Sequence, residues 1–302
     1  MSKSYKTILY EKDKEAPGIV FITLNRPEKR NAISIGPNEM TDEIQDALKQ
    51  AEYDEEVKVI VFRGAGQHFC AGFDLSMVYR VYGGGPDFSP PQATRLRIDE
   101  DHIVGLRRAI LYCKKITITQ VQGWCVEAGM FFAQTSDIAI AAKNAMFAHR
   151  GQRLAFGGTL SMPYELVMGH TKKIVELLIT GRTISGQEAE QIGIVTRAVE
   201  PEILEHEVYS LAKALCLIPS DAVAIGKMSR KNMAESLGLI NLLGQSTYHT
   251  LATNLHYRPE ERQTVFIRDR EKMGAKAAFH KLHEQFEEAL DKTKYFRSYR
   301  PD

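Results

Sequence analysis

Two periodicities of hydrophobic and polar positions divide the chain. Short β-branched runs at 18–24, 57–64 and 116–123 alternate with amphipathic segments of helical spacing, such as 37–53. This alternation predicts strands and helices in a parallel β/α arrangement. At the N-terminus, the runs 7–10 and 18–24 predict a β-hairpin that precedes it. From residue 160 onward, helical spacing dominates. We therefore expect an α/β core over residues 1–205 and a helical region over 206–302.

Two glycine-containing stretches follow strand-like runs, and they read HFCAGFDL at 68–75 and VQGWCVEAGM at 121–130. Small residues at such turns let a ligand approach the backbone and leave peptide N–H groups free. Two such donors that converge on one oxygen form an oxyanion hole, which stabilises an enolate or a tetrahedral oxyanion. Each stretch alone also fits an ordinary packing turn. In a parallel sheet, however, both lie at the carboxyl ends of the strands, where ligands bind.

Composition and charge narrow the class of protein. Hydrophobic residues make up 44% and charged residues 25%, and 39 basic against 38 acidic residues give a net charge of +1. This balance predicts a folded globular protein and no nucleic-acid partner. The four cysteines include no CxxC pair, so we expect no metal site, no disulfide scaffold and a reducing compartment. Without an apolar leader or a long apolar run, the sequence predicts a cytoplasmic protein with no membrane contact.

Several motifs in order carry a family resemblance. They are NRPEKRNA at 25–32, FCAGFDL at 69–75, the spacing from Gly123 to Asp137, LITGR at 178–182 with Lys227, and the ending at 279–286. On these motifs, residues 6–286 resemble the crotonase superfamily, the enoyl-CoA hydratase/isomerase fold. The resemblance implies a ββα superhelix core with a C-terminal helical trimerisation region. It also implies a homotrimer or dimer of trimers, an acyl-CoA substrate and no cofactor beyond the CoA moiety.

The resemblance also assigns site residues. It implies that the backbone N–H groups of Phe73 and Ala128 polarise the thioester carbonyl, although Ala128 stands where the family has glycine. The positions expected to contact the CoA moiety are Lys29, Arg30, Ala32, Ala71, Asp74 and Leu75. Lys29 and Arg30 suit a phosphate but also fit solvated loop charges, and Asp74 fits a structural role better than a catalytic one.

The usual acid/base pair of the family is missing. Its hydratases use two glutamates, because one carboxylate activates water while the other manages the α-proton. In this chain those positions fall at Phe131 and Gly151. Neither residue moves a proton, so we expect neither simple hydration nor the double-bond isomerisation that uses one glutamate.

Other groups near the two stretches are candidates to replace the glutamates. His149, at a predicted strand end, suits a general base near neutral pH, but also fits a histidine in the sheet wall. Glu127 is a second catalytic candidate, and the alternative for it is an ion pair with Arg150 or Arg153. Those arginines fit either an anionic or carbonyl group on the substrate or acids at a trimer contact.

Three further side chains and one loop complete the hypothesis. Tyr79 and Tyr82 fit an acyl pocket or ordinary packing, and the glycine- and proline-rich run 83–91 fits a mobile loop. Thr159 stands where the dehalogenase branch of the family has a nucleophilic aspartate, and a hydroxyl does not support that reaction.

The sequence thus predicts an acyl-CoA enzyme that stabilises a thioester enolate with non-standard acid/base residues. C–C hydrolysis of a β-oxo or cyclic acyl-CoA and decarboxylation both fit this pattern. Two alternatives stay open at this point. One is a catalytically silent acyl-CoA-binding or assembly protein, and the other is a hydratase/isomerase with relocated catalytic groups.

Overall fold

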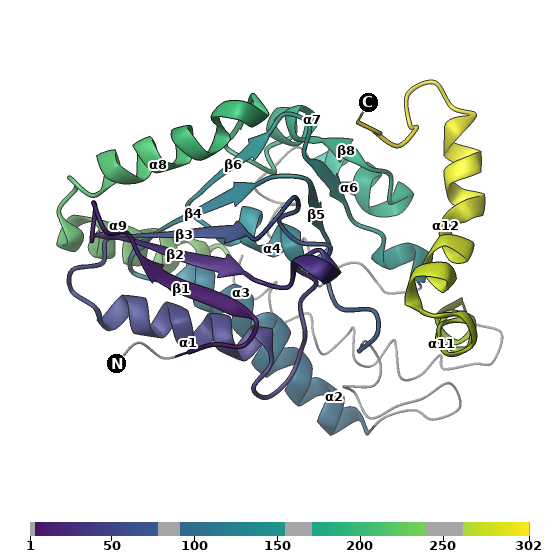
Figure 1. Ribbon diagram of the computed structural model, residues 1–302, viewed down its shortest axis with the longest axis horizontal. Coiled ribbons are helices and arrows are strands. Elements are labelled where there is room, and N and C mark those ends of the chain that lie inside the picture. The colour runs from purple at the N-terminus through teal and green to yellow at the C-terminus, as the bar shows by residue number, and fades with distance from the viewer. Residues whose placement is uncertain (1–3, 78–90, 155–170, 239–261, 302) are drawn as a thin grey trace.

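A computed structural model describes residues 4–77, 91–154, 171–238 and 262–301 of the chain. Its centre is a twisted sheet with helices on both faces, and a C-terminal pair of helices stands beside it (Figure 1). The mixed α/β architecture and the helical C-terminal part confirm the predicted fold class.

The main sheet has six strands in the order β1-β2-β3-β4-β6-β9. Their bounds are Ile8–Lys12, Ile19–Leu24, Val59–Gly64, Ile116–Val121, Ile138–Ala142 and Arg197–Val199. β1 pairs with β2 in antiparallel register, which confirms the predicted hairpin, and every later pair is parallel. The inner strands are almost wholly buried, which is why they read as continuous apolar runs.

A second sheet has three short strands in the order β5-β7-β8. They are Trp124–Val126, Met146–Ala148 and Ile184–Ser185. β5 pairs with β7 in parallel register, so that Trp124 lies beside Met146 and Val126 beside Ala148. This pairing brings the segment after β5 close to the segment after β7.

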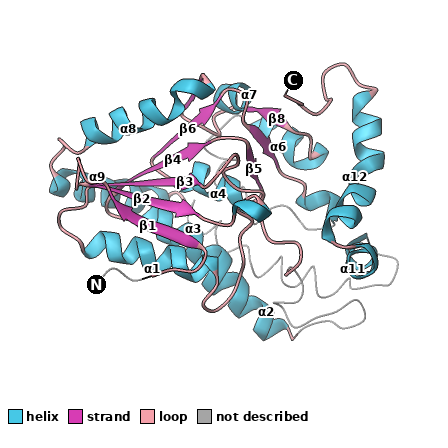
Figure 2. Cartoon of the chain, in the orientation of Figure 1, coloured by secondary structure: helices cyan, strands magenta, loops and turns pink. Residues whose placement is uncertain are grey.

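Helices cover both faces of the main sheet (Figure 2). α1 (Met40–Tyr53), α3 (Gly105–Tyr112) and α4 (Ala128–Thr135) pack together on one face, and α8 (Leu204–Leu215) covers the other. The prediction that α1 begins at Pro37 was wrong. Gly36 and Asn38 have φ values of 129° and 60°, so the chain turns here and the helix starts at Met40.

Three helical segments follow one another without a break before β4. They are α2 (Gln92–Ile98), the π-helical η2 (Asp99–Val104) and α3. The apolar spacing changes at the wider π turns, so the helical period of the sequence is interrupted before α3. Arg95 and Asp99 are fully buried here, and Arg95 Nε lies 3.9 Å from Asp99 Oδ2.

The remaining helices complete the chain, and most of them lie after residue 160, where helical spacing dominates. They are the 3₁₀ helices η1 (Pro27–Lys29), η3 (Gly151–Leu154) and η4 (Pro201–Ile203), and the α-helices α6 (Thr171–Thr180), α7 (Gly186–Gln191), α9 (Ser220–Ser236), α11 (Arg262–Met273) and α12 (Ala275–Asp291). Ser185 caps α7, since its Oγ accepts the Glu188 N–H at 3.1 Å.

The C-terminal part is tied to the core at several points. Three residues of α8 are buried in the main core, and they are Leu204, Val208 and Ala212. The predicted division into a core over 1–205 and a helical region over 206–302 stays a prediction. The tail after α12 returns to β8, where the Tyr299 N–H donates to the Thr183 carbonyl at 2.8 Å. The tail therefore packs on its own chain.

No single helix among the described residues has the length and apolar content of a membrane span. The pair Pro201–Leu215 and Ser220–Ser236 meets that test of length and composition only when both helices are counted together, and it is bent by 103°.

Candidate functional site

The two glycine-containing turns lie against each other. The Cys70 N–H donates to the Trp124 carbonyl at 2.8 Å, and the Val126 N–H donates to the Cys70 carbonyl at 2.9 Å. At Gly72, where φ is +92°, a Cβ would lie 3.0 Å from Glu127 Cβ and 3.1 Å from the Val126 carbonyl oxygen. Glycine therefore allows both the backbone conformation and the close approach of the two turns.

Each turn presents a peptide donor without a partner. Within the described ranges, neither the Phe73 N–H nor the Ala128 N–H makes a hydrogen bond. Ala128 is fully buried and is the first residue of α4, where a helix has no internal acceptor for its N–H groups. A buried donor without a partner, such as the Ala128 N–H, is rare in folded proteins, and the half-buried Phe73 N–H is likewise available for an oxygen of a ligand.

Asp74 holds the first turn in place by charge. Its Oδ2 lies 2.8 Å from Arg26 Nη2 and 2.9 Å from Lys29 Nζ, and its Oδ1 accepts the Ser76 hydroxyl at 2.6 Å. Burial alone would raise the pKa of Asp74, but these hydrogen bonds outweigh it and lower the pKa below its ordinary value. Asp74 is therefore an ionised anchor of the loop, in line with a structural role.

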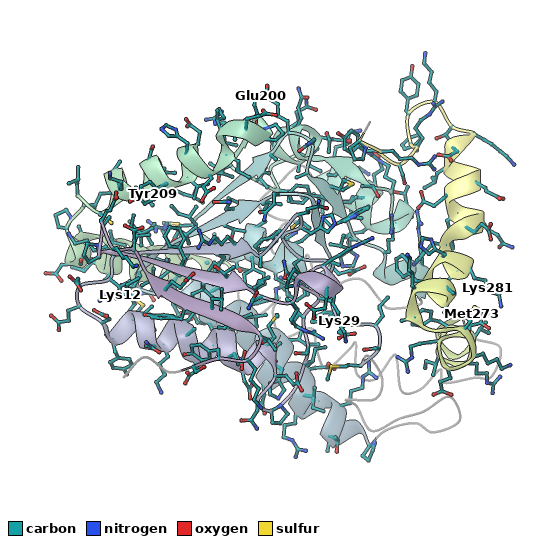
Figure 3. The ribbon with its side chains drawn as sticks, in the orientation of Figure 1. Lys12, Lys29, Glu200, Tyr209, Met273 and Lys281 are labelled. Carbon is teal, nitrogen blue, oxygen red and sulfur yellow. The ribbon has the colours of Figure 1, made fainter. Side chains whose placement is uncertain are left out.

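The C-terminal helices also contact the first turn. Arg270 of α11 is buried, and its Nη1 donates to the Leu75 carbonyl at 2.8 Å. Phe73 and Leu75 pack against a small cluster built on Phe266 and Ile267 of the same helix. Lys29 lies at the end of the sheet that faces α11 and α12, opposite to Lys12 and Tyr209 (Figure 3). The site is thus built between the sheet and the C-terminal helix pair.

The second turn carries a glutamate in a backbone conformation that favours glycine. Glu127 has φ 47° and ψ −112° directly before the first residue of α4. A side chain in this region costs on the order of 1–3 kcal/mol. The strain orients the start of α4 and places the Glu127 side chain beside the segment after β7.

The Glu127 carboxylate contacts His149 and Arg150. Its Oε2 lies 3.0 Å from His149 Nε2, and its Oε1 accepts the Arg150 backbone N–H. The His149 side chain is only 1% exposed, whereas 22% of the Glu127 side chain remains exposed. Among the residues that the structure describes, neither ring nitrogen of His149 makes a hydrogen bond, so Nε2 lies close to the carboxylate without the geometry of a hydrogen bond. The structure thus brings both predicted acid/base candidates together.

The two positions expected for the hydratase glutamates, 131 and 151, lie on different sides of this contact. A Cβ at Gly151 would lie 3.0 Å from His149 Cε1 and 3.7 Å from Glu127 Oε2. Phe131 is buried, its ring centroid is 5.8 Å from that of Phe73, and Arg107 Cζ lies 4.9 Å from its centroid. One position is therefore filled by an aromatic ring, and the other borders a carboxylate from a different residue.

Arg150 and Arg153 are engaged within their own chain. Arg153 Nη1 donates to Glu287 Oε1 of α12 at 2.6 Å, and Arg153 Nε donates to the Thr180 carbonyl at 2.9 Å. Arg150 Nη2 donates to the Thr183 hydroxyl at 3.0 Å. Among the described residues, the alternative considered for Glu127, an ion pair with the side chain of Arg150 or Arg153, is not formed, because its carboxylate accepts the Arg150 backbone N–H instead.

The positions expected to hold the CoA moiety lie together near the first turn. The Ala71 N–H donates to the Arg30 carbonyl at 2.9 Å, and Arg26 Nη1 donates to the Ala32 carbonyl at 2.6 Å. Lys29 and Arg30 are exposed, so their ammonium and guanidinium groups face solvent although Lys29 also pairs with Asp74. Several predicted positions lie outside the described residues. They are Tyr79, Tyr82, residues 83–90 of the predicted loop 83–91, and Thr159.

Two residues that contact the first turn carry no distinctive signal in the sequence. Arg26 was known only as part of the NRPEKRNA motif, and Arg270 lies far along the chain in a polar helix. Within the described part of the chain, no group of three His, Cys, Asp or Glu residues is arranged to hold a metal ion.

The comparisons agree on one family. The model of the enoyl-CoA hydratase/isomerase family matches residues 14–288. The hydroxycinnamoyl-CoA hydratase-lyase of Pseudomonas fluorescens is 32% identical over 200 residues, which cover 66% of this chain and 69% of that protein. A probable enoyl-CoA hydratase, echA12, from Mycobacterium bovis is 29% identical over 265 residues, which cover 84% and 90%.

Solved structures give the same result. An enoyl-CoA hydratase/isomerase from Xanthobacter autotrophicus Py2 is 29% identical, with a TM-score of 0.76 over 93% of this chain and 99% of that one. An enoyl-CoA hydratase from Mycobacterium smegmatis shares the fold with a TM-score of 0.81, at 23% identity over 98% of each chain. The chain therefore belongs to the enoyl-CoA hydratase/isomerase family, the crotonase superfamily, whose members act on CoA thioesters.

Proposed function

We propose that this protein is an enzyme that converts an acyl-CoA through a thioester enolate, with the carbonyl oxygen held by the N–H groups of Phe73 and Ala128. The observation that carries this proposal is the pair of unpartnered donors on two turns in contact. Preorganised donors stabilise an oxyanion without reorganisation during the reaction, and removal of one such donor typically costs about 10²–10³-fold in rate.

The reaction is C–C hydrolysis of a β-oxo or cyclic acyl-CoA, or decarboxylation, rather than simple hydration. Phe131 and Gly151 supply no proton-transfer group, and both reactions generate an enolate without two glutamates. A relative at 32% identity is named a hydratase-lyase. This name supports the idea that a similar sequence catalyses a lyase reaction in addition to hydration.

The acid/base work falls to the pair Glu127 and His149, whose carboxylate oxygen and ring nitrogen lie 3.0 Å apart. The CoA moiety lies over the segment of Lys29, Arg30, Ala32 and Ala71, with Asp74 and Leu75 shaping the turn. No cofactor beyond the CoA moiety is required. We further propose a homotrimer or dimer of trimers in the cytoplasm, and the four unpaired cysteines support a reducing compartment.

Hydrogen exchange tests this function without knowledge of the acyl group. Butyryl-CoA and phenylacetyl-CoA, which have α-protons and no leaving group, are incubated with the protein in D₂O and followed by mass spectrometry. Uptake of deuterium at the α-carbon reports enolate formation. In parallel, acetoacetyl-CoA, malonyl-CoA and a cyclic 2-oxoacyl-CoA are assayed for cleavage products.

The rival function is a catalytically silent acyl-CoA-binding protein, which the loss of carboxylates at 131 and 151 favours. Calorimetric titration with butyryl-CoA distinguishes the two functions. Binding together with exchange or cleavage supports the enzyme. Binding without exchange of either probe and without any cleavage product would reject it in favour of the silent binder.

A further inference from the structure

We infer that the Glu127 carboxylate is the proton-transfer group of this enzyme, and that His149 is a positioning residue that holds it. This inference rests on the proposed function, because it assigns the atom that moves the proton to and from the enolate. A glutamate at the residue before the oxyanion donor would then replace a side chain that hydratases carry at position 151.

Location is the first argument. A Cβ at Gly151 would lie 3.7 Å from Glu127 Oε2, so the carboxylate lies within van der Waals distance of the start of a side chain at 151. Ala128, whose N–H faces the site, directly follows Glu127 in the chain. A carboxylate and an oxyanion donor on adjacent residues keep a short, fixed separation, which a proton transfer at the α-carbon requires.

Backbone strain is the second argument. Glu127 holds φ 47° and ψ −112° at a position where glycine would be unstrained. Strain of this kind persists where the surrounding structure imposes it, and it gathers at functional sites. The neighbouring turn uses Gly72 for its own positive φ of +92°. Glycine would also fit position 127 without strain. The chain nevertheless has a glutamate there, whose side chain adds conformational strain.

The contacts of the carboxylate are the third argument. The Arg150 N–H binds Oε1, and His149 Nε2 lies 3.0 Å from Oε2, so both oxygens have a neighbour on one side, while the His149 side chain itself is only 1% exposed. A carboxylate offers about four lone-pair positions, so these two contacts leave acceptor capacity free. The exposed 22% of the side chain gives a substrate access to it.

The proposed step is balanced within the enzyme and substrate. For a β-oxo thioester, Glu127 takes a proton from water as the water oxygen bonds to the β-carbonyl carbon. The bond between the α- and β-carbons then breaks, and its electron pair forms the enolate whose oxygen the two N–H groups bind. Protonated Glu127 returns the proton to the α-carbon, which yields a carboxylic acid and a shortened acyl-CoA. One carboxylate serves both transfers, and this accounts for the apolar Phe131.

The experiment compares four variants with the wild-type protein in the butyryl-CoA exchange assay. Glu127→Gln keeps the shape of the side chain and should lower the exchange rate by about 100-fold or more, with butyryl-CoA affinity within about threefold. Glu127→Gly relieves the strained backbone, so it should fold with a raised Tm and still lose exchange. Added formate, a small carboxylate, should restore part of the rate in Glu127→Gly only.

Two variants provide the controls. Asn38→Gly relieves another positive φ, of 60°, on an exposed residue outside the site, and should leave exchange unchanged. His149→Ala should lower the exchange rate about tenfold with little change in affinity, and formate should not restore it. This combination separates a group that transfers protons from one that only supports the fold.

Different results overturn the inference or the proposed function. Two results would show that Glu127 does not transfer the proton, while leaving the enolate mechanism intact. One is exchange at the wild-type rate in Glu127→Gln. The other is exchange that is abolished by His149→Ala but not by Glu127→Gln. Absence of exchange and cleavage in the wild-type protein would instead reject the proposed function itself.

Discussion

The two turns of the candidate site each present an unpartnered N–H, and they do so with opposite backbone chemistry. The first turn has a positive φ at Gly72 and is held by Asp74. The Asp74 carboxylate accepts hydrogen bonds from the side chains of Arg26, Lys29 and Ser76. The second turn reaches its conformation through Glu127, at a cost in strain, and is fixed by the His149 contact. Both present an unpartnered N–H at the next residue.

The difference between Asp74 and Glu127 distinguishes a carboxylate that supports a loop from one that is available to react. Asp74 uses all its described contacts to hold a loop, and its low pKa keeps it charged. Glu127 has fewer contacts and remains partly exposed. A charged side chain that is fully neutralised acts as structure, whereas one that is held on one side and open on the other is available for chemistry. Four changes test this contrast.

The largest effect is expected from Ala128→Pro, which removes the N–H of the second turn. Proline is tolerated at the first helical position, and the lost donor should lower turnover by about 100-fold or more. Steady-state rates on whichever acyl-CoA is cleaved, or exchange rates on butyryl-CoA, measure the loss. Ala128→Gly keeps the N–H and is the matched control. A folded proline variant with full activity would rule out the oxyanion hole.

Asp74→Asn should destabilise the protein, because it leaves Arg26 and Lys29 without their shared anion. Loss of one partner of a buried charge cluster costs roughly 3 kcal/mol in free energy of unfolding. The contribution has a pH signature. The folded-state pKa of Asp74 is lowered, so its stabilisation is fully present above about pH 4, the ordinary value, and declines as the pH falls below it. Urea unfolding at a series of acidic pH values should show a smaller decline in the variant.

Arg270→Met should weaken the first turn from the side of α11. It removes a hydrogen bond from a buried guanidinium to the Leu75 carbonyl, worth roughly 1.5–3 kcal/mol. We expect turnover to fall about tenfold, since the Phe73 donor is two residues away. The exposed Lys272 on the same helix provides the control Lys272→Met. Equal rates for the two variants would show that α11 does not position the turn.

The smallest effect concerns stability at the second turn. Glu127→Gly should raise the free energy of unfolding by about 1 kcal/mol, because relief of strain outweighs the lost contact with His149 and the greater entropy of the unfolded glycine chain. Chemical denaturation of wild type, Glu127→Gly and Asn38→Gly measures it. A destabilised Glu127→Gly would mean that the His149 contact contributes more than the backbone costs.

Local patterns predicted much of the fold. The hairpin of β1 and β2, the parallel strands and the cap at Ser185 follow from β-branched runs and a side-chain oxygen before a helix. β9 was missed because its three residues carry no periodicity of their own and depend on pairing with β6. The early start predicted for α1 failed because a proline in a helical pattern does not reveal positive φ at its neighbours.

The sequence indicated where the candidate site lies but not the contacts within it. Glycine turns at strand ends indicated a place for an oxyanion hole, and the family resemblance then implied Phe73 and Ala128 as its donors and positions 131 and 151 as those without glutamate. The meeting of Glu127 with His149 depends on the pairing of β5 with β7, which is a long-range property. The same holds for Arg270, which contacts a residue 195 positions away along the chain.

The π-helical segment Asp99–Val104 has a consequence for length variation in this chain. A π turn accommodates one more residue than an α-helical turn, so removal of a single residue there would leave a regular helix rather than a broken one. The helices on either side would keep nearly their present faces, because the wide turn absorbs the extra residue without rotating them. Arg95, now fully buried, would therefore still point inward. Removal of one residue from the regular turns of α2 would instead rotate the part before it by about 100° around the helix axis, so this chain tolerates the loss of a residue at Asp99–Val104 better than at its neighbours.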